Sequence, residues 1–319
     1  MSAHVYVARL LTDDAMAELA ALGVPLVVGE ERPPTREELL RDAAGAVAVV
    51  CTLTDRIDAA VLDAAGPQMQ VVANVAVGFD NVDVDAARER GVVVTNTPGV
   101  LDGATADLAF GLILAVARRI AEGDRFLRRE TPWVWGPRMM TGLDLSAGAT
   151  LGIVGFGRIG RAVARRARGF DLRLLATPTR SPLSPEDAAG VTFVDLDQLF
   201  ADSDVVTLHC PLTRLTRHLI DDAALSRMKP TALLVNTARG AVVDTEALVR
   251  ALADGEIAGA ALDVFEDEPR VDPRLLAFEQ VVLTPHLGSA GNATRSAMCR
   301  LAVRNVAEVL AGRPPVTPV

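Results

Sequence analysis

Three side chains suited to anion binding and proton transfer each follow a short apolar segment in the second half of the chain. Arg239 lies in NTARG, Glu268 in LDVFEDEP and His286 in TPHLGSA. An arginine can hold a carboxylate through two parallel hydrogen bonds, and a histidine can donate a proton to an oxygen. A glutamate bonded to that histidine favours its protonated form. Together they could bind and reduce a 2-keto acid, although each alone is more typical of a surface ion pair, a solvated turn or a core histidine.

A glycine-rich segment predicts the site of a dinucleotide that would take part in such a reduction. Residues 149–154 form an apolar run typical of a buried parallel strand. Gly155, Gly157 and Gly160 follow with the spacing G-x-G-x-x-G, and RAVARRARGF then has helical spacing. In this setting the glycines allow a tight turn, a close pyrophosphate and close packing of helix on strand. The free N–H groups at the start of the helix would hold the phosphates.

Composition narrows the class of protein. The chain has 319 residues, half of them hydrophobic, so it can form two domains with sizeable cores. A net charge of −9 argues against a nucleic-acid or membrane-surface partner. The longest apolar run, 108–117, is too short for a membrane span, and the start of the chain resembles no signal peptide. We therefore expect a soluble, cytoplasmic protein with buried, reduced cysteines, and we find no metal-ligand spacing.

Apolar runs alternate with helical segments along most of the chain, which predicts parallel sheets covered on both faces. The first block has predicted strands at 5–9, 24–28, 46–51, 71–76 and 92–96. The second block has predicted strands at 149–154, 172–176, 191–194, 205–209, 232–236, 258–263 and 281–284. We expect a buried helix over 105–120, linking the domains or at a subunit interface, and a final helix over 289–311 that folds back on the first domain. Ligands of open parallel sheets lie beyond the carboxyl ends of the strands, where the three reactive side chains are predicted.

The series of motifs resembles one enzyme family over nearly the whole chain. The motifs are NVAVGFDNVDVDAA, GVVVTNTPGVLDGATADLA, GIVGFGRIG, HCPLT, LLVNTARGAVVD, AGAALDVFEDEP and VVLTPHLGSA. In this order they are similar to the D-isomer-specific 2-hydroxyacid dehydrogenase family, and within it to the glyoxylate/hydroxypyruvate reductases. The series is far more specific than any single motif.

The resemblance implies a fold, an activity and an assembly. The fold would be α/β, with two Rossmann-like parallel-sheet domains and the active site in the cleft between them. A flavodoxin-like substrate-binding domain would span 1–100 and be completed by the C-terminal helix, 287–319, while 101–286 would form the dinucleotide-binding Rossmann domain. The activity would be NAD(P)H-dependent reduction of a small 2-keto acid to the D-2-hydroxy acid. The protein would be a homodimer.

The family's functional residues transfer by matching position. Arg239, Glu268 and His286 take the places of the catalytic arginine, glutamate and histidine, with His286 as proton donor. Substrate contacts would come from Leu53, Val77, Gly78, Arg239 and His286. Asp263 takes the place of an aspartate that contacts the nicotinamide carboxamide. The residues expected to contact the cofactor are Thr105, Gly155, Phe156, Gly157, Arg158, Ile159, Gly160, Thr177, Thr179, Arg180, Cys210, Pro211, Thr237, Ala238, Asp263 and Gly288.

One departure from the family bears on which cofactor is used. The second strand of an NAD-binding unit usually ends in an acid that binds the adenosine ribose hydroxyls. Here the strand reads LRLLATPTRSP, and Pro178 stands where the acid would be. Thr177, Thr179 and Arg180 offer hydroxyls and a cation suited to a 2′-phosphate. The sequence therefore favours NADP(H), with NAD(H) still possible.

Other functions stay open from the sequence. Phosphite dehydrogenase shares the same arginine, glutamate and histidine, whereas formate dehydrogenase has a glutamine where Glu268 stands. A dinucleotide-sensing corepressor is an alternative of a different class, because a fold does not fix a function. Specificity would depend on cleft shape around Leu53, Trp135 and two methionines, so the preferred keto acid is not predicted. The remaining histidines, His4, His209 and His218, are interpreted as structural.

Overall fold

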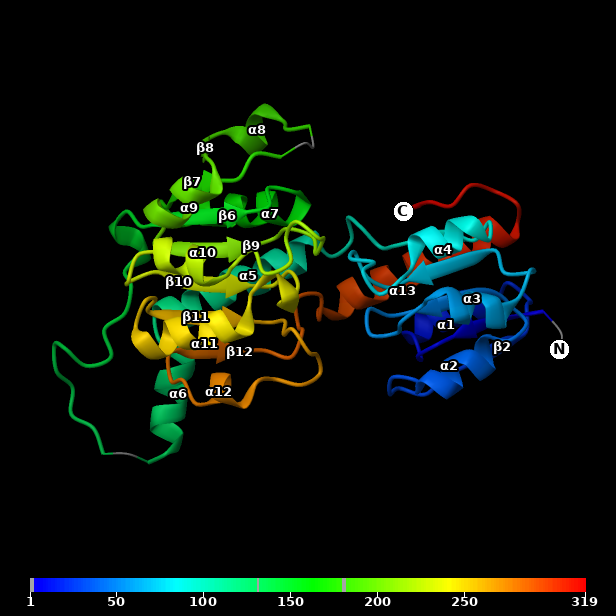
Figure 1. The fold of residues 1–319 in the computed structure, drawn as a ribbon, viewed down its shortest axis with the longest axis horizontal. Helices are drawn as coiled ribbons and strands as arrows, with labels where there is room; N and C mark the ends of the chain where they lie inside the picture. The colour runs from blue at the N-terminus through cyan, green and yellow to red at the C-terminus, as the bar shows by residue number, and fades with distance from the viewer. Residues whose placement is uncertain (1–2, 131, 180–181) are drawn as a thin grey trace. The chain divides into compact units, whose positions relative to one another are not determined.

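A computed structural model of the chain describes residues 3–130, 132–179 and 182–319. It divides into two compact units, each with its own parallel sheet (Figure 1). Unit 1 comprises the residues up to Leu101 together with Ala290–Val319, and unit 2 comprises Asp102–Ser289. The final helix therefore belongs to the first unit, from which it is distant in sequence.

Unit 1 is built around five parallel strands in the order β2-β1-β3-β4-β5. The strands are β1 (His4–Val7), β2 (Leu26–Val28), β3 (Ala46–Cys51), β4 (Val71–Asn74) and β5 (Val93–Thr95). The helices are α1 (Asp13–Ala20), α2 (Arg36–Ala43), α3 (Ala59–Ala65), α4 (Val84–Glu89) and α13 (Asn292–Leu310). Helices α2, α3 and α4 bury their apolar residues against one core with Tyr6 and Val49. Helix α13 packs on α1 and over β3 and β4.

Unit 2 has seven parallel strands in the order β12-β11-β10-β9-β6-β7-β8. The strands are β6 (Thr150–Val154), β7 (Arg173–Ala176), β8 (Val191–Phe193), β9 (Val205–Leu208), β10 (Leu233–Asn236), β11 (Gly259–Leu262) and β12 (Val281–Leu283). The α-helices are α5 (Asp102–Ala117), α6 (Ile120–Arg128), α7 (Arg158–Ala167), α8 (Pro185–Ala188), α9 (Leu196–Asp202), α10 (Asp222–Arg227), α11 (Thr245–Asp254) and α12 (Pro273–Leu276). Short 3₁₀ turns are η1 (Leu145–Ala147), η2 (Arg168–Phe170) and η3 (Gly240–Val242).

Successive side chains of the unit 2 strands pack into two separate hydrophobic cores, one on each face of the sheet. On β10, Leu233 packs with α5 and α7, while Leu234 packs with α9, α10 and α11. Successive side chains of a strand point to opposite faces, so helices on both faces require strands that are apolar throughout. This arrangement confirms the predicted α/β class with two Rossmann-like units.

The topology of unit 2 gathers the chemically interesting loops at one edge of its sheet. From β6 the chain passes to β7 and β8 on one side, and then to β9, β10, β11 and β12 on the other. All strands are parallel, so the loops that follow β6, β9, β10, β11 and β12 leave from their carboxyl ends at the same edge. The point where the strand order reverses, between β6 and β9, is where ligands of such sheets bind.

The predicted helix over 105–120 is wrong at its end. Helix α5 ends at Ala117, and Arg119 adopts a left-handed backbone with φ 53° before α6 begins. The chain returns at Leu143, whose amide donates to the Ala117 carbonyl at 2.9 Å. That bond satisfies a carbonyl that a continuing helix would have used. Ile120, predicted as buried, is 56% exposed.

The other predicted elements are present with ends that differ by a few residues, which is usual for element boundaries. Asp83 caps α4 by accepting a hydrogen bond from the Ala86 amide. The three cysteines are buried and unpaired. Within the described ranges, no helix combines the length and apolarity needed to cross a bilayer.

Candidate active site

His286 and Glu268 form a close pair after β12 and β11. His286 Nδ1 lies 2.9 Å from Glu268 Oε2, and each side chain is about a quarter exposed, at 24%. His286 has a left-handed backbone, with φ 56°. A non-glycine residue holds that conformation only where its surroundings compensate for the strain. The structure therefore brings together two of the three predicted catalytic side chains. The contact is made through Nδ1, so Nε2 is the ring nitrogen that does not face Glu268.

Glu268 is held on its other oxygen as well. Its Oε1 accepts a hydrogen bond from the Phe265 amide at 2.9 Å. Burial raises the pKa of Glu268, but the hydrogen bond and charge of His286, the Phe265 amide and the charge of Arg239 together lower it below its usual range. Glu268 is thus ionised at neutral pH, and an ionised carboxylate stabilises a protonated imidazole.

Asp263 anchors the loop that carries His286. Its side chain is fully buried at the end of β11. The carboxylate accepts hydrogen bonds from Thr284 Oγ1 at 2.6 Å, the Leu287 amide at 2.7 Å and the Gly288 amide at 2.8 Å. Its carbonyl also accepts from the His286 amide at 2.9 Å. These bonds give Asp263 a positioning role that sequence reasoning missed, while its expected contact with a nicotinamide stays a prediction.

Arg239 follows β10 in a loop fixed by Asn236. The Asn236 side chain accepts from the Ala238 amide at 3.0 Å and donates to the Arg239 carbonyl at 2.9 Å. The next residue, Gly240, packs so closely on the Phe265 carbonyl that a Cβ atom there would overlap it. This backbone contact joins the Arg239 loop to the Glu268 loop. Arg239 is half-buried, and its positive charge acts on Glu268.

The glycine-rich turn has the geometry that a dinucleotide needs. Gly155 has φ 93°, and a Cβ atom there would lie 2.5 Å from the Cys210 amide nitrogen. Gly157 is the N-cap of α7 and has no side chain to cap the helix. The first N–H groups of an α-helix have no partner within the helix, and its dipole favours an anion there. These residues fit a pyrophosphate at the start of α7.

Three further candidates for cofactor contact differ in how far their side chains are exposed. Phe156 is 1% exposed and stacks edge-on against Phe193, so only its backbone can meet a ligand. Arg158 is exposed at the first position of α7. Thr237 Oγ1 is buried without a hydrogen-bond partner among the described residues. Since a buried hydroxyl without a partner is costly, a bound cofactor is a natural partner for it.

Of the remaining cofactor candidates, Thr177 contacts the glycine-rich turn directly. Thr177 Oγ1 accepts from the Gly155 amide at 2.9 Å, so Thr177 fixes the glycine turn, which the sequence did not predict. Thr179 is half-buried, Pro178 is exposed, and Arg180 lies outside the described residues. A Cβ atom at Gly288 would lie 3.4 Å from Thr105 Cγ2, which places those two candidates side by side.

The predicted substrate residues of unit 1 lie in loops after β3 and β4. Leu53 follows β3, and Val77 and Gly78 follow β4. The Val77 carbonyl accepts from Asn96 Nδ2 at 2.8 Å, and the Gly78 carbonyl accepts from Asn74 Nδ2 at 2.9 Å. Two asparagines that sequence reasoning did not single out therefore hold the Val77–Gly78 loop.

The fold and these loops match known proteins. Residues 110–288 match the model of the NAD-binding domain of D-isomer-specific 2-hydroxyacid dehydrogenases. The chain belongs to this family. The dehydrogenase is 47% identical to a glyoxylate reductase of Thermococcus onnurineus (strain NA1) over 99% of its own length and 96% of that protein.

Solved structures agree with this membership. The dehydrogenase matches a crystal structure of a protein from Thermus thermophilus with a TM-score of 0.92, at 46% identity over 100% of both chains. It also matches an NADPH-dependent glyoxylate/hydroxypyruvate reductase of Sinorhizobium meliloti, in complex with NADP and malonate, with a TM-score of 0.84. That match has 35% identity and covers 99% of this chain and 96% of the other. The dehydrogenase is therefore an oxidoreductase acting on CH–OH groups with a nicotinamide dinucleotide.

The other histidines of the dehydrogenase have contacts within the fold. His4 Nε2 lies 3.0 Å from the Asp42 carbonyl oxygen, and His209 Nε2 lies 2.9 Å from Thr207 Oγ1. Burial lowers the pKa of His209 to about 3. In the part of the chain that the structure describes, no group of three or more His, Cys, Asp or Glu side chains could hold a metal ion.

Proposed function

We propose that this dehydrogenase reduces a small 2-keto acid of the glyoxylate or hydroxypyruvate type to the D-2-hydroxy acid. The observation that carries the proposal is the His286–Glu268 pair, 2.9 Å apart, with Arg239 on the adjoining loop. Relatives named glyoxylate reductase, nearly half identical over almost the whole chain, support the same substrate class.

In the proposed reaction, Arg239 binds the substrate carboxylate, because its guanidinium can form two parallel hydrogen bonds with it. His286, protonated and bonded through Nδ1 to Glu268, donates the Nε2 proton to the keto oxygen as that atom becomes a hydroxyl. Glu268 keeps the ring oriented and charged. A reduced nicotinamide, when bound, supplies the hydride to the keto carbon. The backbone amides of Val77 and Gly78 are further proposed substrate contacts, on the strength of their sequence position.

The test is steady-state turnover of glyoxylate, hydroxypyruvate and pyruvate with NADPH and NADH, followed at the nicotinamide absorbance. We expect wild-type turnover, and a loss of about 10²- to 10⁴-fold in kcat for His286→Ala, as is usual when a general acid is removed. Cofactor affinity, measured by fluorescence titration, should change little. Oxidation of phosphite with NAD⁺ but no keto-acid reduction would favour phosphite dehydrogenase. Dinucleotide binding without any turnover would favour a sensor.

For the cofactor, we propose a preference for NADP(H) over NAD(H). Support comes from Pro178 in place of a ribose-binding acid, from the Thr177 hydroxyl bonded to the glycine turn, and from a second hydroxyl at Thr179. The structural relative from Sinorhizobium meliloti is described as NADPH-dependent. Arg180 enters this proposal on its sequence position alone. The ratio of kcat/KM for NADPH and NADH measures the preference directly.

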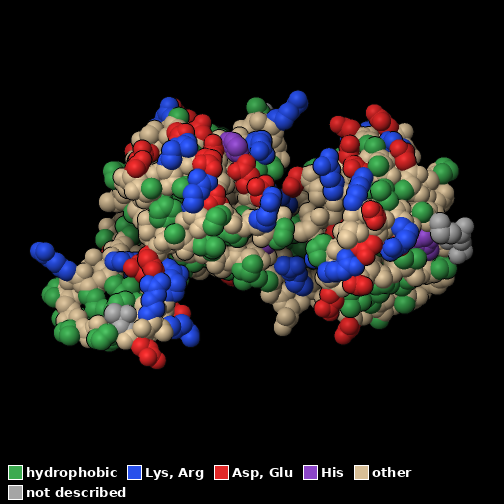
Figure 2. Space-filling view, turned by 60° about the horizontal axis from the view of Figure 1, so that its bottom comes forward, with side chains coloured by type: hydrophobic (Ala, Val, Ile, Leu, Met, Phe, Trp, Pro, Cys, Tyr) green, Lys and Arg blue, Asp and Glu red, His purple; other side chains and the backbone are tan. Residues whose placement is uncertain are grey.

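We also propose that the protein forms a homodimer through α6 and the residues that follow it, 132–135. Its apolar side chains are unusually exposed: Leu127 is 58% exposed, Val134 89% and Trp135 75%. Figure 2 shows hydrophobic and basic side chains gathered over this segment. Exposed apolar groups that cluster in this way are typical of protein interfaces. Arg125, Arg128 and Arg129 lie near these apolar residues in the sequence, which suits an interface rim.

Light scattering coupled to gel filtration tests the dimer. The wild type should elute at about twice the mass of one chain, and Val134→Asp should shift it toward the monomer. Leu215→Asp is the matched control, since Leu215 is also highly exposed, at 90%, but lies before α10 rather than after α6. A monomeric wild type, or equal effects of the two variants, would contradict this interface.

A cytoplasmic location is proposed as well. The three cysteines are buried free thiols, which suits a reducing compartment. Fractionation of cells that express the protein, followed by immunoblotting, would test the location.

A further inference from the structure

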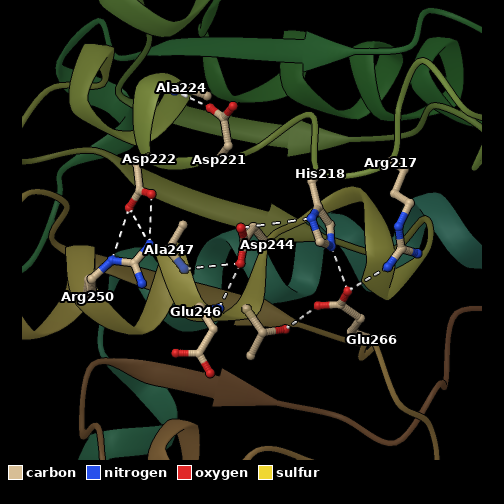
Figure 3. A network of polar contacts seen from close by, with 11 residues as sticks. Arg217, His218, Asp221, Asp222, Ala224, Asp244, Glu246, Ala247, Arg250 and Glu266 are labelled. Atoms are coloured by element: carbon tan, nitrogen blue, oxygen red, sulfur yellow. Dashed lines mark hydrogen bonds and ion pairs between the residues drawn. The ribbon is translucent and has the colours of Figure 1, made fainter.

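His218 lies in a charged network next to the loop that carries Glu268. Figure 3 shows His218 between Asp244 and Glu266, with Arg217 beside them. His218 Nε2 is 2.6 Å from Glu266 Oε1, and Nδ1 is 3.9 Å from Asp244 Oδ2. Arg217 donates to the same Glu266 oxygen at 3.2 Å. The charged groups that face the His218 ring are therefore Glu266, Asp244 and Arg217.

The Glu266 carboxylate gathers contacts from two other segments. Besides His218 and Arg217, Thr245 Oγ1 donates to Glu266 Oε2 at 3.1 Å. Burial raises the pKa of Glu266, but the hydrogen bonds from His218 and Thr245 outweigh it and lower that pKa. The carboxylate is thus ionised at neutral pH, and hydrogen bonds to an ionised acceptor are the stronger kind.

The backbone at His218 and just after it is paired with the turn that follows Arg239. The His218 amide donates to the Ala241 carbonyl at 2.8 Å, and the Ile220 amide donates to the Val242 carbonyl at 3.0 Å. The backbone of His218 is left-handed, with φ 51°, a conformation that its neighbours must hold in place. His218 therefore lies on the segment that is hydrogen-bonded to η3, and its ring contacts Glu266.

These contacts join the two loops that carry the proposed catalytic side chains. Glu266 precedes Glu268 by two residues, and Gly240, directly after Arg239, packs on the carbonyl of Phe265, the residue before Glu266. We propose that His218 is a positioning residue: through Glu266 it fixes the loop of Glu268 against the loop of Arg239. This inference rests on the proposed function, because Glu268 and Arg239 matter only if they act on a substrate.

Loss of the His218 contact should change the position of Glu268 enough to alter the rate of reduction. Glu268 holds both of its bonds, to the Phe265 amide and to His286, at 2.9 Å. A displacement of its loop by about 1 Å would break the bond to His286, and misplacements of that size cost up to about 10²-fold in rate. The loss should appear in kcat and in the pH dependence of reduction, because His286 would lose the negative partner that favours its charged form.

The experiment compares His218→Ala, His218→Gln and Arg250→Ala with the wild type. Glutamine can place an amide N–H near Glu266, so it should restore most of what alanine loses. Arg250, also drawn in Figure 3, forms its exposed ion pair with Asp222 and not with Glu266, which makes it the matched control. We expect His218→Ala to lower kcat for keto-acid reduction about 10-fold or more. Its alkaline fall-off should move to lower pH, with KM for the cofactor within about 2-fold.

A double-mutant cycle tests whether His218 acts through Glu266, and a further variant covers the case in which His218→Ala does not fold. If His218 acts through Glu266, then His218→Ala combined with Glu266→Ala should be no worse than either single variant. Should His218→Ala fail to fold, Glu266→Gln provides the same test, since it keeps the loop but removes the charge. Wild-type kcat and pH profile in His218→Ala, equal losses in the Ala and Gln variants, or additive losses would each overturn the proposal.

A readout that needs no turnover separates this inference from the proposed function. The chain has four histidines, so the ring signals of His286 can be assigned by NMR through single substitutions. In His218→Ala the His286 signals should titrate at lower pH than in the wild type, whether or not the protein reduces any keto acid. Inactivity of the wild type on all keto acids would defeat the proposed function. An unmoved His286 titration would defeat the positioning role.

Discussion

Replacement of Glu268 by glutamine should move the pH dependence of reduction without abolishing activity. The side chain keeps its size, and the Phe265 amide can still hold one of its atoms in place. What is lost is the negative charge at 2.9 Å from His286 Nδ1. The protonated ring is the form that donates the proton, and it loses its charged partner.

The size of the shift follows from the contact. A hydrogen bond to a charged group contributes about 1.5–3 kcal/mol, whereas a neutral one contributes about 0.5–1.5 kcal/mol. The difference, roughly 1.4 kcal/mol, corresponds to about one pH unit in the midpoint of the alkaline limb. The glutamine has a single carbonyl oxygen, so it cannot accept from both the Phe265 amide and His286 Nδ1. If its NH₂ group faces the ring, the charged form is disfavoured further, and one unit is then a lower bound.

The assay is kcat/KM for glyoxylate reduction between about pH 5 and 9 at saturating cofactor, for the wild type and Glu268→Gln. Reduction by the variant should fall off about one pH unit earlier as pH rises, with rates near wild type on the acid side. Glu246→Gln is a suitable control, because Glu246 forms an exposed ion pair with Arg274 in the same unit. Profiles that superimpose would refute the idea that Glu268 keeps His286 charged. A shift to higher pH would contradict the sign of the interaction.

Three further predictions concern other parts of the molecule. Arg239→Lys should lower kcat/KM about 10²-fold with cofactor affinity nearly unchanged, because an ammonium cannot form two parallel bonds to a carboxylate; an active variant would leave Arg239 with charge alone. Arg180→Ala should raise KM for NADPH more than KM for NADH, by about 10-fold if one charged hydrogen bond is lost; equal changes would contradict the NADP(H) preference. Burial lowers the pKa of His209 to about 3, so the unfolded chain takes up a proton below pH 6.5 that the fold resists. Stability should then be full above that pH and fall as pH decreases, by about 2 kcal/mol at pH 5. Urea unfolding of His209→Gln should show a flatter dependence, and an unchanged slope would mean that His209 is accessible to protons in the fold.

The sequence predicted the fold, and the position of the three proposed catalytic side chains after strands, because both depend on local patterns. Strands that are apolar on both faces, such as β10, and helices between them leave few arrangements other than a covered parallel sheet. Arg239, Glu268 and His286 each directly follow a strand or its short turn, and parallel topology carries such positions to one edge. The end of α5 could not be predicted in this way. It depends on Leu143, which returns from 26 positions further along to bind the Ala117 carbonyl.

Two positioning roles that sequence reasoning missed share a physical feature: a side chain holds a loop by binding its backbone. Asp263 holds His286 by accepting from the amides of Leu287 and Gly288, and Asn236 holds Arg239 through its carbonyl. Such bonds leave no periodicity or charge pattern in the sequence, because every residue has a backbone to offer. His218 acts through its side chain, but its partner Glu266 is 48 positions away, so no local pattern in the sequence indicates the contact. In the positioning proposal its effect on chemistry is exerted entirely through Glu266, so a catalytic site in this fold extends as far as the bonds that fix its loops.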